Sequence, residues 1–347
     1  MRNTLITRCL CIISVLLSPL VIANDKSLEQ RIAALESKTT GKGELWYDNL
    51  NFNGLVEVEA GYSSPDAGDS SSDLVVATVA LGAEAALTEN LSIAVALLYE
   101  EDDTDLEVDI ATISYTHISN GFSLALGQDY LPFGAYSTAL VNDPLTLELG
   151  ETRETAFVAS YESGYFASSL YLFNGDQDKD DRDRLNNIGA RITFVSDNVA
   201  VGVDYISNLA DSDGLQDGYY GFDAGEDVVD GSSIYGGFTF GSAQLFVEHL
   251  RALDEFAGDG NNSEPSATQF EISFEAGDFI YAAAYQETDE ALFLGLPEER
   301  ISVGLSTEIL GGLGLAVELL RDEDYAIADG GTGDSTDSLV LQFAAEF

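Results

Sequence analysis

The sequence predicts an all-β protein: a sixteen-stranded antiparallel transmembrane β-barrel preceded by a short N-terminal helix. Three observations predict this fold. Successive segments alternate between apolar and polar or small side chains, with the two-residue period of a strand. The connections alternate between short turns and long loops, as in up-and-down barrels. One face of the alternation carries no charge near its centre, although the chain contains 61 Asp and Glu residues.

The alternation is clear in most of the expected strands. In residues 270–276, Phe270, Ile272 and Phe274 share one face, while Glu271 and Glu275 lie on the other. We place the strands at residues 51–63, 73–87, 90–101, 105–118, 121–130, 152–163, 165–174, 186–196, 198–208, 232–241, 243–253, 267–277, 279–288, 298–309, 313–323 and 337–347. The parity of residues 105–118 and 165–174 is ambiguous.

The uncharged face indicates contact with lipid. A Lys or Arg facing lipid near the bilayer midplane costs about 2–4 kcal/mol, and an acid costs less. The sheet must also close, because an open edge in hydrocarbon leaves backbone groups without hydrogen bonds. A soluble β-sandwich is the alternative, but it would not keep one face free of charge over so many strands.

The chain carries signals of export to a bacterial outer membrane. Residues 1–23 predict a signal peptide, with Arg2 and Arg8 before an apolar run and cleavage after Ala23. The apolar run is shorter than the ~20 residues of a membrane-spanning helix. The last residue, Phe347, resembles the aromatic terminal signal of outer-membrane proteins. We therefore expect a Gram-negative outer-membrane protein surrounded by lipid and lipopolysaccharide, with both termini on the periplasmic side.

Residues 24–50 predict a periplasmic helix and linker before the barrel. Leu28, Ile32 and Leu35 recur at the spacing of a coiled-coil seam. The seam is too short to be stable alone, but three copies tethered to barrels could associate. A homotrimer is therefore expected, with a lone amphipathic periplasmic helix as the alternative.

Composition excludes several classes of function. The net charge of −47 argues against nucleic-acid binding, which needs a basic face. Both cysteines lie within the signal peptide, so the mature chain has no disulfide and no thiolate metal site. The acidic segment 176–181 lacks the Gly of a calcium loop, and a solvated outer loop is the favoured interpretation. No cofactor is expected.

An enzyme is not expected either. His117 falls at the end of a strand, and His249 shares the parity of Leu245 and Val247, which directs it toward lipid or the membrane interface. Neither position suits a histidine that works within a catalytic site.

The long connection 131–151 is the candidate constriction of a pore. Its apolar residues, such as Leu145, Leu147 and Leu149, would be out of place in a freely solvated loop. We expect it to fold into the lumen and narrow it; packing over the barrel mouth is the alternative. The candidate constriction residues are Tyr130, Asp143, Glu148, Glu151, Arg153 and Arg191.

Acidic side chains dominate the face that should line the lumen. Glu57, Glu59, Glu271 and Glu275 have inward parity, and Arg191 is a rare inward base. A lumen lined in this way predicts a preference for cations over anions.

The chain resembles the siderophore porins of the LbtU type. The resemblance rests on the Leu-x-x-Arg-Ile-x-x-Leu-Glu helix, on the strand beginning Phe52-Asn53-Gly54, and above all on residues 127–155. That stretch contains Leu131-Pro132-Phe133-Gly134 and Asp143-Pro144-Leu145-Thr146-Leu147. The resemblance implies uptake of siderophores or other iron chelates without a TonB-coupled plug. Independently, only about 27 residues lie between the signal peptide and the first strand, too few for a plug domain.

Alternative functions remain at this stage. A general diffusion porin that favours cations has the same architecture. A barrel enzyme would require the histidines, and a structural adhesin would not conduct ions.

Overall fold

The computed structural model describes residues 49–101, 104–117, 120–175, 185–218, 228–257 and 262–347. The expected signal peptide, nearly all of the expected helix and linker at 24–50, and the acidic segment 176–181 lie outside the described residues.

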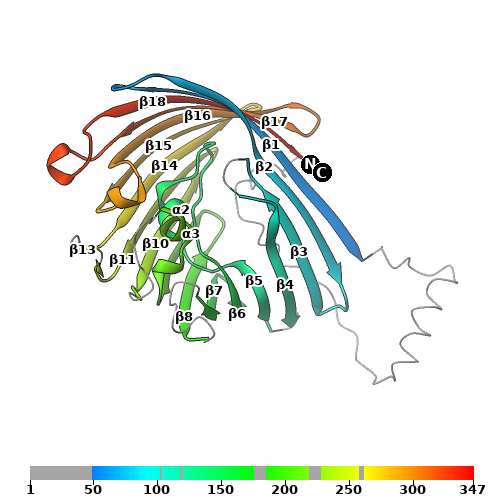
Figure 1. Ribbon diagram of the computed structural model, residues 1–347. Helices are drawn as coiled ribbons and strands as arrows, with labels where there is room; N and C mark the ends of the chain where they lie inside the picture. Colours follow the sequence, from blue (N-terminus) through cyan, green and yellow to red (C-terminus); the bar gives the residue numbers. More distant parts are fainter. Residues whose placement is uncertain (1–48, 102–103, 118–119, 176–184, 219–227, 258–261) are drawn as a thin grey trace.

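Sixteen antiparallel strands form one closed barrel, which confirms the predicted fold class (Figure 1). Each expected strand boundary lies within two residues of the observed one. The strands are β1 (Leu50–Pro65), β2 (Ser71–Ala86), β3 (Leu91–Tyr99), β4 (Glu107–His117), β5 (Phe122–Tyr130), β6 (Arg153–Ser163), β7 (Phe166–Asn174), β8 (Asn187–Val195), β9 (Val199–Ile206), β10 (Gly231–Phe240), β11 (Ala243–Ala252), β14 (Ser266–Ala276), β15 (Phe279–Asp289), β16 (Glu299–Leu310), β17 (Leu313–Glu323) and β18 (Ser335–Glu346). A separate small hairpin consists of β12 (Phe256–Ala257) and β13 (Asn262–Ser263).

The barrel closes where β1 pairs with β18, from Leu55 opposite Glu346 to Pro65 opposite Thr336. Gly54 and Phe347 extend this pairing, because each donates its N–H to the carbonyl of the other at 3.1 Å. A Cβ at position 54 would overlap the Phe347 ring, so a larger residue there would displace that ring.

A belt of exposed apolar side chains surrounds the barrel, and each of the sixteen strands contributes to it. Representative members are Val56, Leu81, Val95, Ile113, Leu126, Phe157, Leu170, Ile192, Val203, Ile234, Leu245, Ile272, Tyr281, Val303, Leu319 and Phe343. Soluble monomers rarely expose a continuous apolar surface of this extent. The belt therefore has the character expected of a lipid-facing wall. No helix in the described part of the chain is long and apolar enough to cross a membrane.

The structure explains the ambiguous parity of the two strands. In β4, a bulge inserts Asp109. Val108, which is exposed, therefore pairs with Leu97, while Ile110, which is buried, pairs with the adjacent Ala96. In β7, the inward side chains Tyr171 and Phe173 are apolar because they pack against other apolar groups inside the barrel.

Two long connections fill part of the interior. The β5–β6 connection contains α2 (Leu145–Gly150), and the β9–β10 connection contains η1 (Leu209–Asp211) and α3 (Asp213–Gly218). Figure 1 shows α2 and α3 within the ring of strands. Two further short helices, η3 (Leu292–Leu294) and η4 (Ile327–Asp329), lie in later connections.

The helix α2 packs by its apolar face. Leu145 and Leu149 are four residues apart, so they lie on one side of the helix, and both are 0% exposed. They join a cluster of buried side chains that includes Tyr171, Ile206 and Leu250 from the barrel wall. The connection 131–151 is therefore held inside the barrel partly by an apolar core of its own.

Candidate functional site

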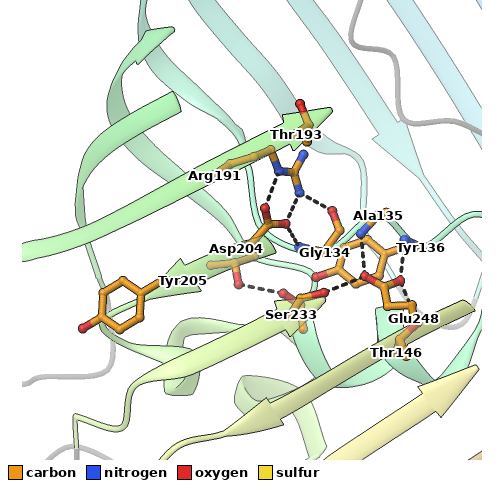
Figure 2. Close-up of polar contacts among 12 residues, drawn as sticks. Gly134, Ala135, Tyr136, Thr146, Arg191, Thr193, Asp204, Tyr205, Ser233 and Glu248 are labelled. Carbon is orange, nitrogen blue, oxygen red and sulfur yellow. Dashed lines mark hydrogen bonds and ion pairs between the residues drawn. The ribbon is translucent and has the colours of Figure 1, made fainter. Parts of the chain in front are cut away.

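The connection 131–151 lies inside the barrel, as predicted, and its backbone is bound to the wall. Asp204 on β9 accepts the N–H of Gly134 at 2.9 Å. Glu248 on β11 accepts the N–H groups of Ala135 and Tyr136 at 2.7 and 2.8 Å (Figure 2). These N–H groups belong to irregular backbone that forms no ladder, so they need acceptors, and carboxylates are the strongest acceptors available.

The same arrangement continues along the connection. Glu271 on β14 accepts the N–H of Ala139 and the hydroxyl of Thr138, each at 2.7 Å. Glu318 on β17 accepts the N–H groups of Val141 and Asn142 at 2.7 and 2.8 Å.

Finally, Gln286 on β15 accepts the N–H of Leu145 at 2.6 Å. The acceptors thus stand on β9, β11, β14, β15 and β17, so the connection extends along more than a third of the wall.

The expected lumen acids therefore differ in whether they hold the connection. Glu271 is 5% exposed and anchors the connection. Glu59 accepts a hydrogen bond from Gln342 at 2.9 Å, and Glu275 is half-buried near the end of β14. Sequence reasoning did not select Glu248, which is 0% exposed and accepts four hydrogen bonds. The sequence signal that could have found Glu248 is its lumen-facing position in β11, on the face opposite to the apolar Val247.

Both expected constriction arginines are held by carboxylates. Arg191 donates from Nε to Asp204 Oδ1 at 3.0 Å and from Nη2 to Oδ2 at 2.6 Å, and it also donates to the Gly134 carbonyl (Figure 2). Arg153 pairs with Glu107 and Asp109. The hydroxyl of Tyr130 donates to Asp109 at 2.9 Å, so Tyr130 and Arg153 belong to one cluster.

This cluster closes a gap between two strands. The β4–β5 ladder ends at the pair Ala111 and Gln128. Beyond it, the Gln128 amide donates to the carbonyls of Val108 and Asp109, at 2.7 and 3.1 Å. Side chains therefore replace the missing backbone bonds at the bulge.

No arginine in the described residues lacks an acidic partner, and these ranges contain no lysine. The partners are Glu107 and Asp109 for Arg153, Asp204 for Arg191, Glu264 for Arg251, Asp322 for Arg300, and Glu323 and Asp337 for Arg321. The described lumen therefore presents no uncompensated positive charge.

Carboxylates gather where the connection faces the open lumen. Asp143 and Glu148 are exposed there. Desolvation by the surrounding protein raises the pKa of the Asp143 carboxyl, and repulsion from other carboxylates adds to the shift. Those carboxylates are Glu148 on α2, Glu100 after β3, and Glu57 and Glu59 on β1. The structure thus brings Asp143 and Glu148 together with two of the four predicted lumen acids.

Glu151 lies in a second acidic group at the end of α2. Desolvation raises its pKa to about 8, and repulsion from Asp213, Asp143, Asp109 and Glu148 contributes. Since the nearby Arg153 is already paired with Glu107 and Asp109, it does not cancel this negative potential.

The histidines lie on the strands where the sequence placed them. His249 on β11 contacts the Thr268 hydroxyl through Nδ1 at 3.0 Å, and His117 ends β4. Within the described ranges, His, Cys, Asp and Glu side chains form no group suited to holding a metal ion.

Comparison with known proteins gives distant relatives. No family model matches the chain. It is 26% identical over 299 residues to a UPF0422 protein of Coxiella burnetii, covering 79% of this chain and 64% of that protein. It is 25% identical over 354 residues to a UPF0422 protein of Legionella pneumophila (strain Lens), covering 86% of this chain and 66% of that protein. The chain thus spans less than two thirds of the length of these relatives.

Solved structures resemble the barrel closely enough to show its fold. Salmonella typhi OmpF matches with a TM-score of 0.65 and 11% identity, over 86% of this chain and 97% of that one. The outer membrane channel DcaP of Acinetobacter baumannii matches with a TM-score of 0.62 and 15% identity, over the same shares. The chain has the fold of the outer-membrane porins. None of the relatives or structures named here is described as a siderophore porin of the LbtU type.

Proposed function

We propose that this protein is a passive pore of the bacterial outer membrane that conducts small hydrophilic solutes and prefers cations. The observation that carries the proposal is the charge balance of the constriction. Carboxylates of the connection and of β1 interact electrostatically, while each described arginine is already paired with an acid. A narrow passage lined by one sign of charge concentrates ions of the opposite sign.

The anchoring of the connection supports a stable constriction. Backbone N–H groups along it are bound to buried carboxylates, and α2 is packed by two fully buried leucines. A constriction held in this way keeps a constant width.

Conductance across planar bilayers tests this function. In a potassium chloride gradient, the reversal potential should have the sign of a cation-selective pore. Replacing Glu57 and Glu59 together by Gln should shift the reversal potential toward zero, because both carboxylates contribute to the negative potential at Asp143. Glu275→Gln, which removes one carboxylate away from the connection, is the control and should change it less. An anion-selective reversal potential in the unaltered protein would refute the proposal.

The export and assembly expected from the sequence are part of the same proposal. Residues 1–23 would direct export, and residues 24–50 would form a periplasmic helix that associates in a trimer. Leu28, Ile32 and Leu35 support this, because their spacing is that of a coiled-coil seam. Chemical cross-linking of the protein with and without residues 24–48 tests the role of the helix in assembly.

Uptake of siderophores or other iron chelates is a second candidate, favoured by the resemblance at residues 127–155. The segments that carry it, Leu131–Gly134 and Asp143–Leu147, are parts of the connection that turn into the lumen and bind its wall. The acidic constriction would favour a neutral or cationic chelate over an anionic one. Growth of a deletion strain on chelated iron, with and without this chain, tests the idea; equal growth would refute it.

A further inference from the structure

A second feature of the lumen is an apolar cavity between the connection and the short turns of the barrel. The start of the connection, residues 131–137, covers it. Its wall side is formed by inward residues of four consecutive strands: Arg191 and Thr193 on β8, Ala200 on β9, Tyr235 and Gly237 on β10, and Phe246 on β11. Ion conduction through an acidic passage does not require such a cavity.

The cavity exists because the wall residues at the centre of the cavity have small side chains. Gly237 stands opposite Ala200 on one side and Phe246 on the other. A Cβ at Gly237 would meet its nearest atoms at 3.9 and 4.0 Å, so the space above it is open. Neither Ala200 nor Gly237 extends a side chain far into the lumen, while Tyr235 and Phe246 border the opening with aromatic rings.

The ring of Tyr235 is held in place. It lies against Gly202, where a Cβ would overlap it, and the Arg191 guanidinium stands 5.7 Å from its centroid. Arg191 is itself fixed by Asp204 and by the Gly134 carbonyl (Figure 2). The Tyr235 side of the border is therefore preorganised, which lowers the entropy lost on binding.

The charge around the cavity favours a particular ligand. Within it, Asp204 compensates the charge of Arg191, and Glu151 is the one carboxylic acid in a mostly apolar lining. The passage beside it carries the carboxyl groups of Asp143 and Glu148, near those of Glu57 and Glu59 on β1. A solute with a positive charge and a flat apolar ring matches both environments, since rings stack on aromatic side chains and cations are attracted to carboxylates and ring faces.

We propose that this cavity binds the ring of small organic cations as they pass the constriction. The inference rests on the proposed cation-preferring pore and names a class of solute for it. It predicts that an aromatic ammonium ion dwells in the lumen longer than an aliphatic one of the same charge.

The test compares two probes as blockers of potassium current in planar bilayers. Benzyltrimethylammonium should block at a concentration roughly tenfold lower than tetramethylammonium, the factor expected of one good aromatic contact. Gly237→Leu should reduce this ratio to near one, because the leucine fills the floor of the cavity. Gly61→Leu is the matched control: position 61 is on the lumen face of β1, its Cβ would have no neighbour within 4 Å, and the ratio should persist.

The outcomes separate the two proposals. A pore that selects anions would refute the proposed function itself. A cation-selective pore that both probes block equally would refute only the binding cavity. The binding cavity would also be refuted if Gly61→Leu and Gly237→Leu both brought the ratio of blocking concentrations to near one. The substitutions would then act by narrowing the lumen in general. Phe246→Leu, which keeps an apolar side chain but removes a ring, should lower the ratio several-fold even if Gly237→Leu fails to fold.

Discussion

Removal of the Glu248 carboxylate should loosen the constriction. This side chain lies on β11, is 0% exposed and accepts hydrogen bonds from Ala135, Tyr136, Ser233 and Thr146. In Glu248→Ala, the two backbone N–H groups of the connection would lose their acceptor while remaining inside the barrel.

The size of the effect follows from those two bonds. A hydrogen bond to a charged group contributes about 1.5–3 kcal/mol, so losing both costs the bound position about 3–6 kcal/mol. The lower value alone raises the population of a detached state by about a hundredfold. Asp204, Glu271, Glu318 and Gln286 still hold the rest of the connection, so we expect local release near residue 135 and not loss of the constriction.

Single-channel recording measures the outcome. The mean conductance of Glu248→Ala and its open-channel noise should exceed those of the unaltered protein, because a mobile segment alternately opens and narrows the lumen. Glu248→Gln keeps one acceptor oxygen and should have an intermediate effect.

The control variant is Glu275→Gln, which removes a lumen carboxylate of the same charge that forms no hydrogen bond to the connection. If Glu248→Ala and Glu275→Gln gave the same conductance and noise, the role of Glu248 as an anchor would be refuted. A change of selectivity alone, without a change of conductance, would lead to the same conclusion.

Three further predictions follow. The pKa of Glu151 is raised to about 8, so its charge is lost as the pH falls through that value. The permeability ratio of cations to anions should therefore fall between about pH 9 and about pH 6, well above the range in which an ordinary carboxyl titrates. A reversal potential that does not change with pH would contradict this. Leu149→Ala should destabilise the packed connection by about 2–5 kcal/mol, seen as faster protease cleavage there in the folded barrel, and unchanged cleavage would count against its packing role. Gly54→Val should displace the Phe347 ring and weaken barrel closure, which a heat-modifiability gel would show as loss of the folded band, whereas Gly61→Val should keep that band.

Much of the fold could be predicted because strand periodicity is a local property. Lipid outside and water inside impose opposite requirements on alternate residues, so the pattern of 270–276 or 313–323 reports the wall without knowledge of its neighbours. The apolar residues of 131–151 likewise indicated burial, and the structure places that connection inside the barrel.

The sequence by itself determined a closed wall of sixteen strands, the positions of those strands and an acidic interior. Only the tertiary structure decided which inward acids meet water and which hold backbone, since Glu248 and its partner Tyr136 are 112 residues apart. It also decided the parity of β4 and β7, through a bulge and through apolar packing in the lumen. The role of each inward acid and the parity of these strands depend on which distant segments fill the barrel. An alternating pattern along one strand carries no information about those segments.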